Sequence, residues 1–418
     1  MYLFYQTILT FIILISPLII IYRIFNDKED KRRFIEKFSI SSIKRKKGKI
    51  IWLHGASVGE ILSVIPIIKN FEKNRNINQI LFTSSTLSSS KILKNYRFKK
   101  TIHQFYPIDH FFLTSKFLNY WKPDLAIFVE SEIWPCMFKN INSRNIPLIL
   151  LNARITKKTY IKWIGLGNFS KSIFNKITAA YPQNLETNFF LKKLMSTNKK
   201  INILGNLKFV EQKLTKNEKN NKIFFNKFNK KKIWVASSTH VKEEVFCAEA
   251  HIELKKRVKN LITIIIPRHV HRANEIIEKL SNLNLKTVLH STNPKNLNKV
   301  DIYVVDTFGE TNKFHKIAPT VFLGGSIIKR GGQNPLEAAR HGSKILHGPN
   351  VDNFKDVYKL LKSLRISKKI NSPKNLANLI IFKKNKISGQ KIRKIGEKIL
   401  KKTIKELDTF INNEFKKT

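Results

Sequence analysis

The stretch KIIWLHGASVGEILSVIPIIKNF, residues 49–71, joins a short apolar run to a longer apolar segment through a turn that contains glycine. Lys49–His54 is predicted to be a buried strand and Ile61–Phe71 a helix. A strand that leads into a helix in this way is the building unit of an α/β domain with a largely parallel sheet.

The same alternation continues along the chain in two series. The first series has further apolar runs at Ile80–Thr83, Leu125–Val129, Pro147–Leu151 and Thr178–Tyr181. The second has runs at Ile233–Ser237, Leu261–Ile266, Lys286–Leu289, Ile302–Val305 and Val321–Leu323, with helices such as Glu243–Val258 between them. Two α/β domains are therefore predicted, with ligands bound in a cleft where the carboxyl ends of the strands face each other.

Length and composition agree with this division, since 418 residues with 42% hydrophobic side chains are ample for two cores. The Lys/Asn-rich residues 211–232 show little periodicity and are interpreted as a linker. The expected organisation is an anchor at 1–25, an N-terminal domain at 30–215, a C-terminal domain at 225–395 and a basic helix at 396–418.

The N-terminal segment has the composition of a membrane anchor. Residues 1–22 carry no charge, and about 20 apolar residues suffice to cross a bilayer core. There is no basic start of the kind that a signal peptide has. Pro17 leaves a kinked or interfacial insertion open. Basic residues follow the segment, which by the positive-inside rule places the domains on the cytoplasmic side of the inner membrane; they are Arg23, Lys28, Lys31, Arg32 and Arg33.

The net charge of +49 indicates anionic partners such as a membrane surface or an acidic substrate, although a composition rich in Lys, Asn and Ile also inflates it. The lysines are scattered rather than gathered in a stripe with aromatics, which argues against a nucleic-acid-binding protein. The two cysteines, Cys136 and Cys247, imply neither a disulfide framework nor a zinc site.

Glycine marks one candidate binding loop. Only 15 glycines occur in the chain, and several of them lie in the segment GGSIIKRGGQNPLEAARHG at 324–342, after an apolar run. Here a glycine turn leads into a helix that is expected to open with Pro335, an arrangement that suits a phosphate. Glu337 in the first turn can accept hydroxyls of a ribose, or it can simply stabilise the helix.

Acidic side chains are scarce, yet five of them stand at ends of apolar runs or in glycine turns, namely Glu60, Glu130, Glu132, Glu310 and Glu337. Each can be a helix cap or an ion-pair partner, but together they favour a functional site. Glu60 is expected to be kept ionised near pH 7 by its helix start, so that it can take a proton from a sugar hydroxyl.

Basic groups and turns complete the candidate site. Arg268, after the run Leu261–Ile266, has a planar fork that suits a phosphate. The turn Asp306–Glu310 can offer backbone groups to a nucleobase. Lys208 is either a positive charge at the site or one more solvated lysine.

These segments, in this order, resemble the 3-deoxy-D-manno-octulosonic acid (Kdo) transferase family that acts on lipid A precursors. The matching motifs span nearly the whole chain: HGASVGE at 54–60, ESEIWP at 130–135, LNARIT at 151–156, GNLKF at 205–209, ASSTH at 236–240, IPRH at 266–269, DTFGE at 306–310, GGQNPLEAA at 331–339 and NFKD at 353–356.

The resemblance implies a GT-B fold, meaning two Rossmann-like domains facing a cleft. It implies CMP-Kdo as donor, a lipid A precursor (lipid IVA) as acceptor, an inverting reaction, and no metal or other cofactor. It makes Glu60 the proton acceptor and Glu130 and Lys208 transition-state stabilisers. It assigns CMP binding to Pro267, Arg268, Phe308, Gly309, Glu310, Asn334, Pro335, Leu336 and Glu337.

Two alternatives stay open at this point. One is another GT-B glycosyltransferase that uses a different nucleotide sugar. The other is a basic, membrane-associated nucleic-acid-binding protein, for which acidic residues at strand ends have no use.

Overall fold

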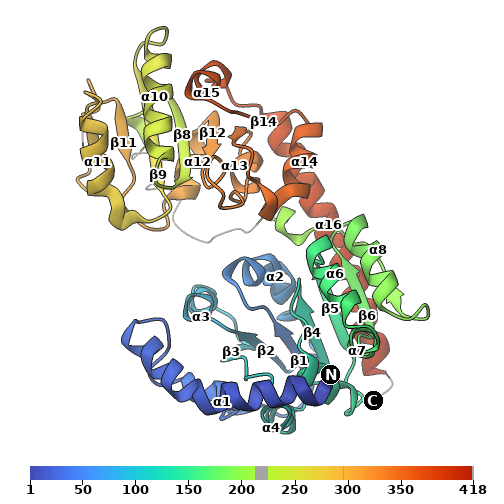
Figure 1. Ribbon diagram of the computed structural model, residues 1–418. Coiled ribbons are helices and arrows are strands. Elements are labelled where there is room, and N and C mark those ends of the chain that lie inside the picture. The colour runs from blue at the N-terminus through green and yellow to red at the C-terminus, as the bar shows by residue number, and fades with distance from the viewer. Residues whose placement is uncertain (212–224, 295, 417–418) are drawn as a thin grey trace. The chain divides into compact units, whose positions relative to one another are not determined.

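The computed structural model describes residues 1–211, 225–294 and 296–416, and it divides into two compact units (Figure 1). Unit 1 comprises Met1–Gln212 and Gly396–Thr418, and unit 2 comprises Lys213–Ile395. Most of the stretch interpreted as a linker, 211–232, lies outside the described residues. Each unit is an α/β domain built on a parallel sheet, as the alternation of apolar runs predicts.

The sheet of unit 1 has seven parallel strands among the described residues. Counted along the chain, the second and third strands add to one side of the first strand, and the fourth strand pairs with its other side, so the direction of growth reverses there. In spatial order the strands are β3 (Thr101–Phe105), β2 (Gln79–Ser84), β1 (Ile50–His54), β4 (Leu125–Val129), β5 (Leu148–Ala153), β6 (Ala179–Pro182) and β7 (Lys200–Ile201). A reversal of this kind is the topological switch point at which doubly wound sheets bind ligands.

Helices cover both faces of this sheet because successive side chains of its strands point to opposite sides. From β1, Ile51 and Leu53 pack with α2, α3 and the end of α16, whereas Ile50 and Trp52 pack with α4, α5, α7 and α8. The helices of unit 1 are α1 (Tyr2–Phe25), α2 (Val58–Phe71), α3 (Leu87–Lys94), α4 (Phe111–Trp121), α5 (Pro135–Asn142), α6 (Lys157–Gly165), α7 (Asn168–Phe174) and α8 (Leu185–Leu194), with short 3-10 helices η1 (Phe34–Phe38) and η2 (Leu207–Phe209).

Unit 2 repeats this architecture on a second parallel sheet. In spatial order its described strands are β10 (Thr287–Leu289), β11 (Ile302–Val304), β9 (Leu261–Pro267), β8 (Lys232–Thr239), β12 (Thr320–Leu323), β13 (Lys344–His347) and β14 (Ser367–Lys369). Its helices are α10 (Glu243–Lys255), α11 (Ala273–Ser281), α12 (Thr311–Ile317), α13 (Leu336–Arg340), α14 (Lys355–Ser363) and α15 (Pro373–Leu379), with η3 (Val270–Arg272) and η4 (Asp352–Phe354).

The C-terminal helix α16 (Lys386–Phe415) starts earlier than the expected 396 and belongs to both units. Its start is stabilised by Asn385, whose Oδ1 accepts a hydrogen bond from Ser388 N at 3.0 Å. From Gly396 onward the helix belongs to unit 1, where Leu407 and Ile411 are buried in the core beside α2. The part of the final helix from Gly396 onward is thus integrated into the N-terminal domain's core rather than being a separate appendage.

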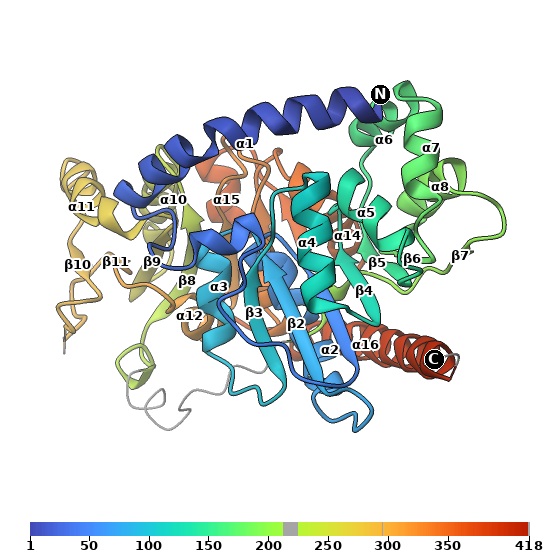
Figure 2. The same cartoon turned by 90° about the horizontal axis from the view of Figure 1, so that it is seen from below.

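The apolar helix α1 lies against unit 1 rather than apart from it (Figures 1 and 2). Leu9 and Ile20 are buried on its inner side, and Tyr5 Oη donates a hydrogen bond to Asp109 Oδ2 at 2.9 Å. Its other sides expose a continuous set of large apolar side chains, among them Phe4, Phe11, Leu14, Leu18 and Phe25. By length and hydropathy α1 is able to cross a membrane.

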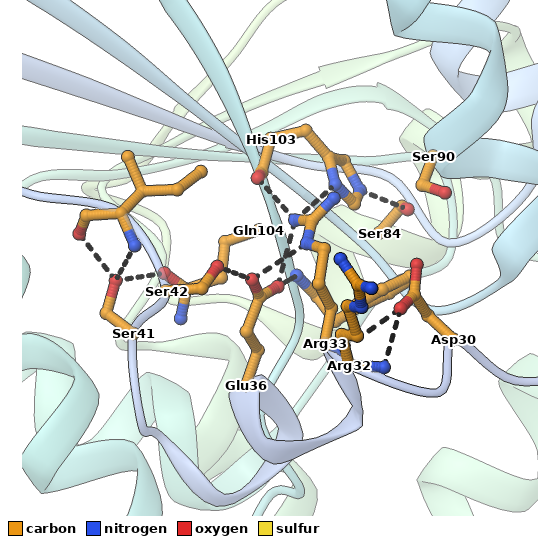
Figure 3. Close-up of polar contacts among 12 residues, drawn as sticks. Asp30, Arg32, Arg33, Glu36, Ser41, Ser42, Ser84, Ser90, His103 and Gln104 are labelled. Atoms are coloured by element: carbon orange, nitrogen blue, oxygen red, sulfur yellow. Dashed lines mark hydrogen bonds and ion pairs between the residues drawn. The ribbon is translucent and has the colours of Figure 1, made fainter.

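The segment after α1 contains an ion pair whose two side chains hydrogen-bond to the backbone of the edge strand β3 (Figure 3). Arg33 Nε lies 2.9 Å from Glu36 Oε1, and Arg33 Nη2 donates to the carbonyl oxygen of His103 at 2.6 Å. Glu36 is fully buried and accepts a hydrogen bond from Phe105 N at 2.7 Å. These contacts satisfy an edge-strand N–H that would otherwise lack a sheet partner, and they fix where the anchor segment joins the domain.

Candidate active site

Glu60 stands in the first turn of α2, where it closes a capping box with Ser57. Its Oε1 accepts a hydrogen bond from Ser57 Oγ at 2.8 Å, and its Oε2 accepts one from Ala56 N at 2.7 Å. Ser57 Oγ in turn accepts from the backbone N–H of Glu60 at 3.4 Å. Glu60 is therefore a helix-capping residue, one of the two roles considered from the sequence. The cap holds its carboxylate over the turn that follows β1.

The environment of Glu60 favours its protonated form. Burial, followed by the charges of Glu132 and Glu130, raises the pKa of Glu60 to about 7, against the hydrogen bonds of Ser57 and Ala56, which lower it. The expectation that the helix start keeps this carboxyl ionised near pH 7 is therefore wrong in part, because burial outweighs the cap. A base with a pKa near the working pH is the kind that proton transfer favours.

Glu130 and Lys208, separated by 78 positions in the sequence, form a direct ion pair. Lys208 Nζ lies 2.7 Å from Glu130 Oε1, and both side chains are largely buried. Asn152 links the two segments, because its Nδ2 donates to Glu130 Oε1 at 3.4 Å and its Oδ1 accepts from Leu207 N at 3.0 Å. Lys208 is therefore a positive charge held beside Glu130 and not a solvated surface lysine.

The backbone at Glu130 is strained. Its φ of +58° lies in the left-handed region, which is costly for a residue that has a Cβ. The turn directly follows β4, and Glu130 N still donates to Leu151 O at 2.9 Å. Strain of this kind persists where the surroundings enforce it and is concentrated at functional sites.

Glu132 has an indole and an imidazole as partners instead of a lysine. Its Oε2 accepts a hydrogen bond from Trp134 Nε1 at 2.9 Å and lies 3.2 Å from His54 Nε2. His54, the last residue of β1, is fully buried, and its Nδ1 lies 3.0 Å from Thr83 Oγ1. Sequence reasoning noted Glu132 only as a strand-end acid and missed His54, although the latter is a polar residue inside an apolar run.

These side chains collect at one place in unit 1. Strands β1 and β4 are neighbours, with His54 opposite Phe128, and the strand order reverses between them. Glu60 follows β1, whereas Glu130 and Glu132 follow β4, so three carboxylates, one lysine and one histidine gather at the switch point. The arrangement can accept a proton and can stabilise both signs of developing charge.

In unit 2, Pro267 and Arg268 stand at the end of a central strand. Pro267 is the buried last residue of β9, and Arg268 N donates a hydrogen bond to Thr239 O at 2.9 Å. The side chain of Arg268 is exposed. A guanidinium presented at a strand end in this way is available to an anionic ligand.

The turn after β11 presents the second predicted segment. The side chain of Phe308 is 92% exposed, and Gly309 adopts a φ of +88° that favours glycine. Glu310 is the residue before α12 and makes no capping hydrogen bond with its side chain; its Oε2 lies 2.6 Å from Lys313 Nζ. An exposed aromatic ring beside an open backbone turn is suited to contact with a flat ligand such as a base.

In the third predicted segment, Asn334–Glu337, the helix starts one residue later than the sequence predicted. Helix α13 begins at Leu336, and Pro335 precedes it as the N-cap residue. Asn334 Oδ1 accepts a hydrogen bond from Leu336 N at 3.1 Å, so one of the N–H groups expected to be free for a phosphate already has a partner. The helix has only five residues, so its dipole is smaller than the sequence suggested.

Glu337, in the first turn of α13, faces a buried histidine. Its Oε2 lies 3.8 Å from His315 Nδ1, and His315 Nε2 lies 3.1 Å from Ser237 Oγ at the end of β8. Burial lowers the pKa of His315 to about 3, so this ring is neutral at physiological pH. Burial also raises the pKa of Glu337, while Arg340 lowers it. Glu337 is thus a carboxyl near the ends of β8 and β12 that faces a neutral ring.

Two of the clustered glycines serve a structural carboxylate that sequence reasoning missed. Glu243 is fully buried and accepts hydrogen bonds from Gly325 N at 2.7 Å and Ile327 N at 2.9 Å. A Cβ at Gly324 would lie 2.4 Å from the carbonyl oxygen of Ser238, so only glycine fits there. Residues 324–327 of the glycine-rich segment therefore bind a side chain of the protein itself. Only residues 331–337 of that segment remain as the candidate ligand-binding loop.

Several buried polar atoms near the same strand ends have no hydrogen-bond partner within the part of the chain that the structure describes. They are Thr239 Oγ1, His240 Nε2, Thr307 Oγ1 and His315 Nδ1. Such atoms are costly to bury without partners and are often satisfied by a ligand. In the same described residues no group of three or more His, Cys, Asp or Glu side chains has an arrangement that suits a metal ion.

Comparison with known proteins gives a consistent family. Residues 31–211 match the family described as 3-deoxy-D-manno-octulosonic-acid transferase (kdotransferase). A curated protein named 3-deoxy-D-manno-octulosonic acid transferase, from Rickettsia bellii, is 33% identical over 397 residues, which cover 94% of this chain and 93% of the relative.

Solved structures resemble the chain in fold. A UDP-GlcNAc 2-epimerase from Neisseria meningitidis aligns with a TM-score of 0.56 and 12% identity, covering 88% of this chain and all of the other. A glycosyltransferase from Rickettsia africae aligns with a TM-score of 0.53 and 10% identity, covering 89% of this chain and all of the other. The fold is therefore of the GT-B type, with two Rossmann-like domains.

Proposed function

We propose, from the premise that this chain belongs to the 3-deoxy-D-manno-octulosonic acid (Kdo) transferase family, that it moves Kdo from CMP-Kdo to a hydroxyl of a lipid A precursor. The reaction is an inverting single displacement. The observation that carries this proposal is the position of Glu60 beside the Glu130–Lys208 pair at the switch point of unit 1. A capping carboxylate with no catalytic task does not need a strained, ion-paired acid as its neighbour.

The proposed reaction assigns Glu60 to the acceptor. The acceptor hydroxyl oxygen forms a bond to the anomeric carbon of Kdo, its proton passes to Glu60, and the bond from that carbon to the phosphate of CMP breaks. Glu60 has a pKa of about 7, so near neutral pH an appreciable fraction is ionised and still basic enough to take the proton. One base and no enzyme nucleophile give inversion at the anomeric carbon.

The two partners of the ion pair act on opposite charges. Positive charge develops on the sugar as CMP leaves, and the carboxylate of Glu130 opposes it. Negative charge develops on the leaving phosphate, and Lys208 opposes that charge. Because the pair is preformed at 2.7 Å, little reorganisation is needed when the charges appear.

The donor is assigned to the strand ends of unit 2. Arg268 supplies a fork for the phosphate, and the turn at Phe308, Gly309 and Glu310 offers an exposed ring and open backbone to the base. The segment Asn334–Glu337 supplies a carboxyl for the ribose. The likeness of DTFGE and NPLE to the family motifs favours CMP over the uridine nucleotides that name several proteins of the same fold. CMP-Kdo is an activated donor, so neither metal nor cofactor is invoked.

The proposed acceptor is a lipid embedded in the membrane to which α1 would anchor the protein. Helix α1 is long and apolar enough to cross a membrane, and most of it is not buried against the domain. The basic residues that follow it favour the cytoplasmic side of the inner membrane for the catalytic units. Anionic head groups attract such residues by about 1 kcal/mol each near the surface. An enzyme held at that surface meets a lipid-linked acceptor directly.

The donor assignment is tested by calorimetry on the full-length protein in detergent, titrated with CMP and with UDP. CMP is expected to bind measurably more tightly than UDP. Tighter binding of UDP would replace CMP-Kdo by another nucleotide sugar. Nuclear magnetic resonance of the product, with attention to the anomeric centre of the transferred sugar, tests inversion separately, since retention would require a second displacement.

A further inference from the structure

Helix α1 contacts unit 1 along its whole length and not only at the end that joins the domain (Figures 1 and 2). Its buried and partly buried residues mostly recur every three or four positions, so they form one stripe along the helix. They are Tyr2, Tyr5, Gln6, Leu9, Ile13, Ser16, Ile20, Arg23 and Ile24. A stripe from the first turn to the last is typical of a helix that lies lengthwise on a protein surface. A helix that crosses a bilayer alone is covered by lipid on all sides instead.

Polar side chains hold the beginning of α1 on unit 1. Tyr5 Oη donates a hydrogen bond to Asp109 Oδ2 at 2.9 Å. Asp109 is buried, and the same oxygen accepts from Cys136 N, at the start of α5, at 3.0 Å. Gln6 Nε2 lies 3.7 Å from Cys136 Sγ. The first turns of α1 are therefore fixed on the segment that joins β4 to α5.

An ion pair holds the other end of α1. Arg23 Nε lies 3.1 Å from Glu29 Oε2. Glu29 is buried, and the same oxygen lies 2.5 Å from Lys37 Nζ on η1. The last turn of α1 is therefore fixed on the segment that leads into the first strand.

The separation of these two attachments argues against a helix that crosses a membrane. Tyr5 and Arg23 are 18 positions apart, which is about 27 Å along an α-helix. The hydrocarbon core of a bilayer is about 30 Å thick. In a crossing helix the two residues would lie near opposite faces of the bilayer, whereas here both are attached to one folded domain.

The side of α1 that is turned away from unit 1 is apolar. Leu3, Phe11, Leu14, Leu18 and Phe25 are each more than half exposed, and they are spread over the full length of the helix. No side chain from residue 1 to residue 22 is charged. A contiguous exposed apolar surface of this kind marks a contact with a membrane or with another protein.

The charges around this apolar side favour a membrane as its partner. Lys139 Nζ lies 4.1 Å from the centre of the Tyr2 ring at one end of α1, and the exposed side chains of Lys28, Lys31 and Arg32 follow the other end. Cations beside an apolar helix face suit the anionic head groups of a bilayer. A second copy of this chain would instead bring its own net charge of +49 against the same cations.

We infer that α1 lies in the plane of the membrane interface, held between unit 1 and the acyl chains of an anionic bilayer, and does not cross the bilayer. The stripe on unit 1 takes the place of the polar face that a free interfacial helix turns toward water. Both ends of α1 then lie on the same side of the membrane as the catalytic units. The inference concerns how the protein meets the membrane, so it holds or fails independently of which sugar is transferred.

The test measures the depth of three positions of α1 in vesicles of phosphatidylethanolamine and phosphatidylglycerol. Leu3→Cys, Leu14→Cys and Phe25→Cys are made singly in the full-length protein and spin-labelled. Depth follows from collisions of each label with oxygen, which concentrates among the acyl chains, and with a water-soluble nickel complex. The three native side chains are exposed, whereas Cys136 and Cys247 are buried, so labelling is selective.

A helix in the interface plane places the three labels at similar depths just below the head groups. A crossing helix places Leu14→Cys about 16 Å deeper than the other two, because it is 11 positions from each. That result would overturn the inference. Labels that do not change when vesicles are added would also overturn it, and would leave the apolar side to a second copy of the chain. Leu18→Cys replaces Leu14→Cys if the latter does not fold.

A control and a second measurement complete the test. Lys401→Cys is exposed on α16, which packs on the opposite face of the sheet from α4 and α5, and its label should stay in water. A protease-cleavable tag before Met1 should be removed completely when the protein is bound to the outside of sealed vesicles. Protection of the tag would mean that the N-terminus has crossed. Both readouts remain decisive even if the protein transfers no Kdo.

Discussion

Lys208 Nζ lies 2.7 Å from Glu130 Oε1, which joins two segments 78 positions apart at the carboxyl edge of one sheet. The pair brings together two residues that resemblance alone made transition-state stabilisers. It also gives them a physical reason to act together, because two opposite charges compensate each other in a largely buried place.

Lys208→Ala is expected to lower kcat on the order of 10²-fold, because it removes a charge that opposes the leaving phosphate. It also leaves Glu130 buried and unpaired, which should lower the free energy of unfolding by on the order of 3 kcal/mol. The measurements are steady-state transfer and chemical denaturation. Lys171→Ala, an exposed lysine on α7, should change neither. A Lys208→Ala enzyme with wild-type kcat would remove Lys208 from the reaction.

Glu60→Gln is expected to bind CMP as the wild type does and to lose transfer by roughly 10²–10⁴-fold, since the amide cannot accept the proton. The amide oxygen still accepts from Ala56 N or Ser57 Oγ, so the capping turn is largely preserved. Transfer rates and CMP calorimetry on one preparation separate the two effects. Retention of more than about a tenth of the turnover would mean that another group is the base.

The same substitution is expected to stabilise the protein at alkaline pH. The pKa of Glu60 is raised to about 7 in the folded chain from an ordinary value of 4.5. Stability contributed by its protonated form is therefore fully present below about pH 4.5 and is lost as pH rises through about 7. The free energy of unfolding of Glu60→Gln relative to wild type should accordingly increase between about pH 5 and 8, by on the order of 2 kcal/mol. Guanidinium denaturation at several pH values measures this, and a pH-independent difference would contradict the raised pKa.

Much of the fold follows from the sequence, and the exceptions have physical reasons. Every apolar run that predicted a strand, from Lys49–His54 to Val321–Leu323, overlaps an observed strand. Strands β3, β7, β13 and β14 were not predicted, because polar or charged residues interrupt or flank the short apolar signal in Thr101–Phe105, Lys200–Ile201, Lys344–His347 and Ser367–Lys369. A partly solvated edge strand such as β3 has no need of a continuous apolar run.

The sequence predicted which residues belong to the candidate site, but it did not predict which of them contact each other. Strand ends and glycine turns pointed to Glu60, Glu130 and Glu337. The pairing of Glu130 with Lys208 depends on how η2 returns to β4, which no local pattern encodes. Burial and the nearby acids Glu132 and Glu130 raise the pKa of Glu60. The rule that a helix start favours an ionised carboxylate predicted a change of the pKa in the opposite direction. Glu243 was missed because its use of the glycine loop is visible only in three dimensions.

Glu337→Ala is expected to weaken CMP binding by about 1–3 kcal/mol, the usual effect of losing a charged hydrogen-bond partner. The fold should persist, because Leu336 N is still held by Asn334 Oδ1. Calorimetry on the full-length protein measures the affinity, with Glu249→Ala on the exposed side of α10 as the control. An unchanged affinity would move the ribose contact away from α13.

Deletion of residues 1–25 is expected to release a folded protein from the membrane fraction, since all strands begin after the segment. It should also cost stability, because Asp109 loses the hydrogen bond from Tyr5 Oη, worth about 1–3 kcal/mol. Fractionation and thermal denaturation measure the two effects. Tyr5→Phe in the full-length chain is the comparison and should show only the loss of stability. Recovery of unfolded aggregate alone would make α1 part of the core.

The central claim is tested most directly by incubating the purified full-length protein with CMP-Kdo and lipid IVA and weighing the lipid product by mass spectrometry. The account predicts an acceptor that is heavier by whole Kdo units, with free CMP released in equal number, and no such product with Glu60→Gln. An acceptor of unchanged mass in the presence of folded, CMP-binding protein would contradict it.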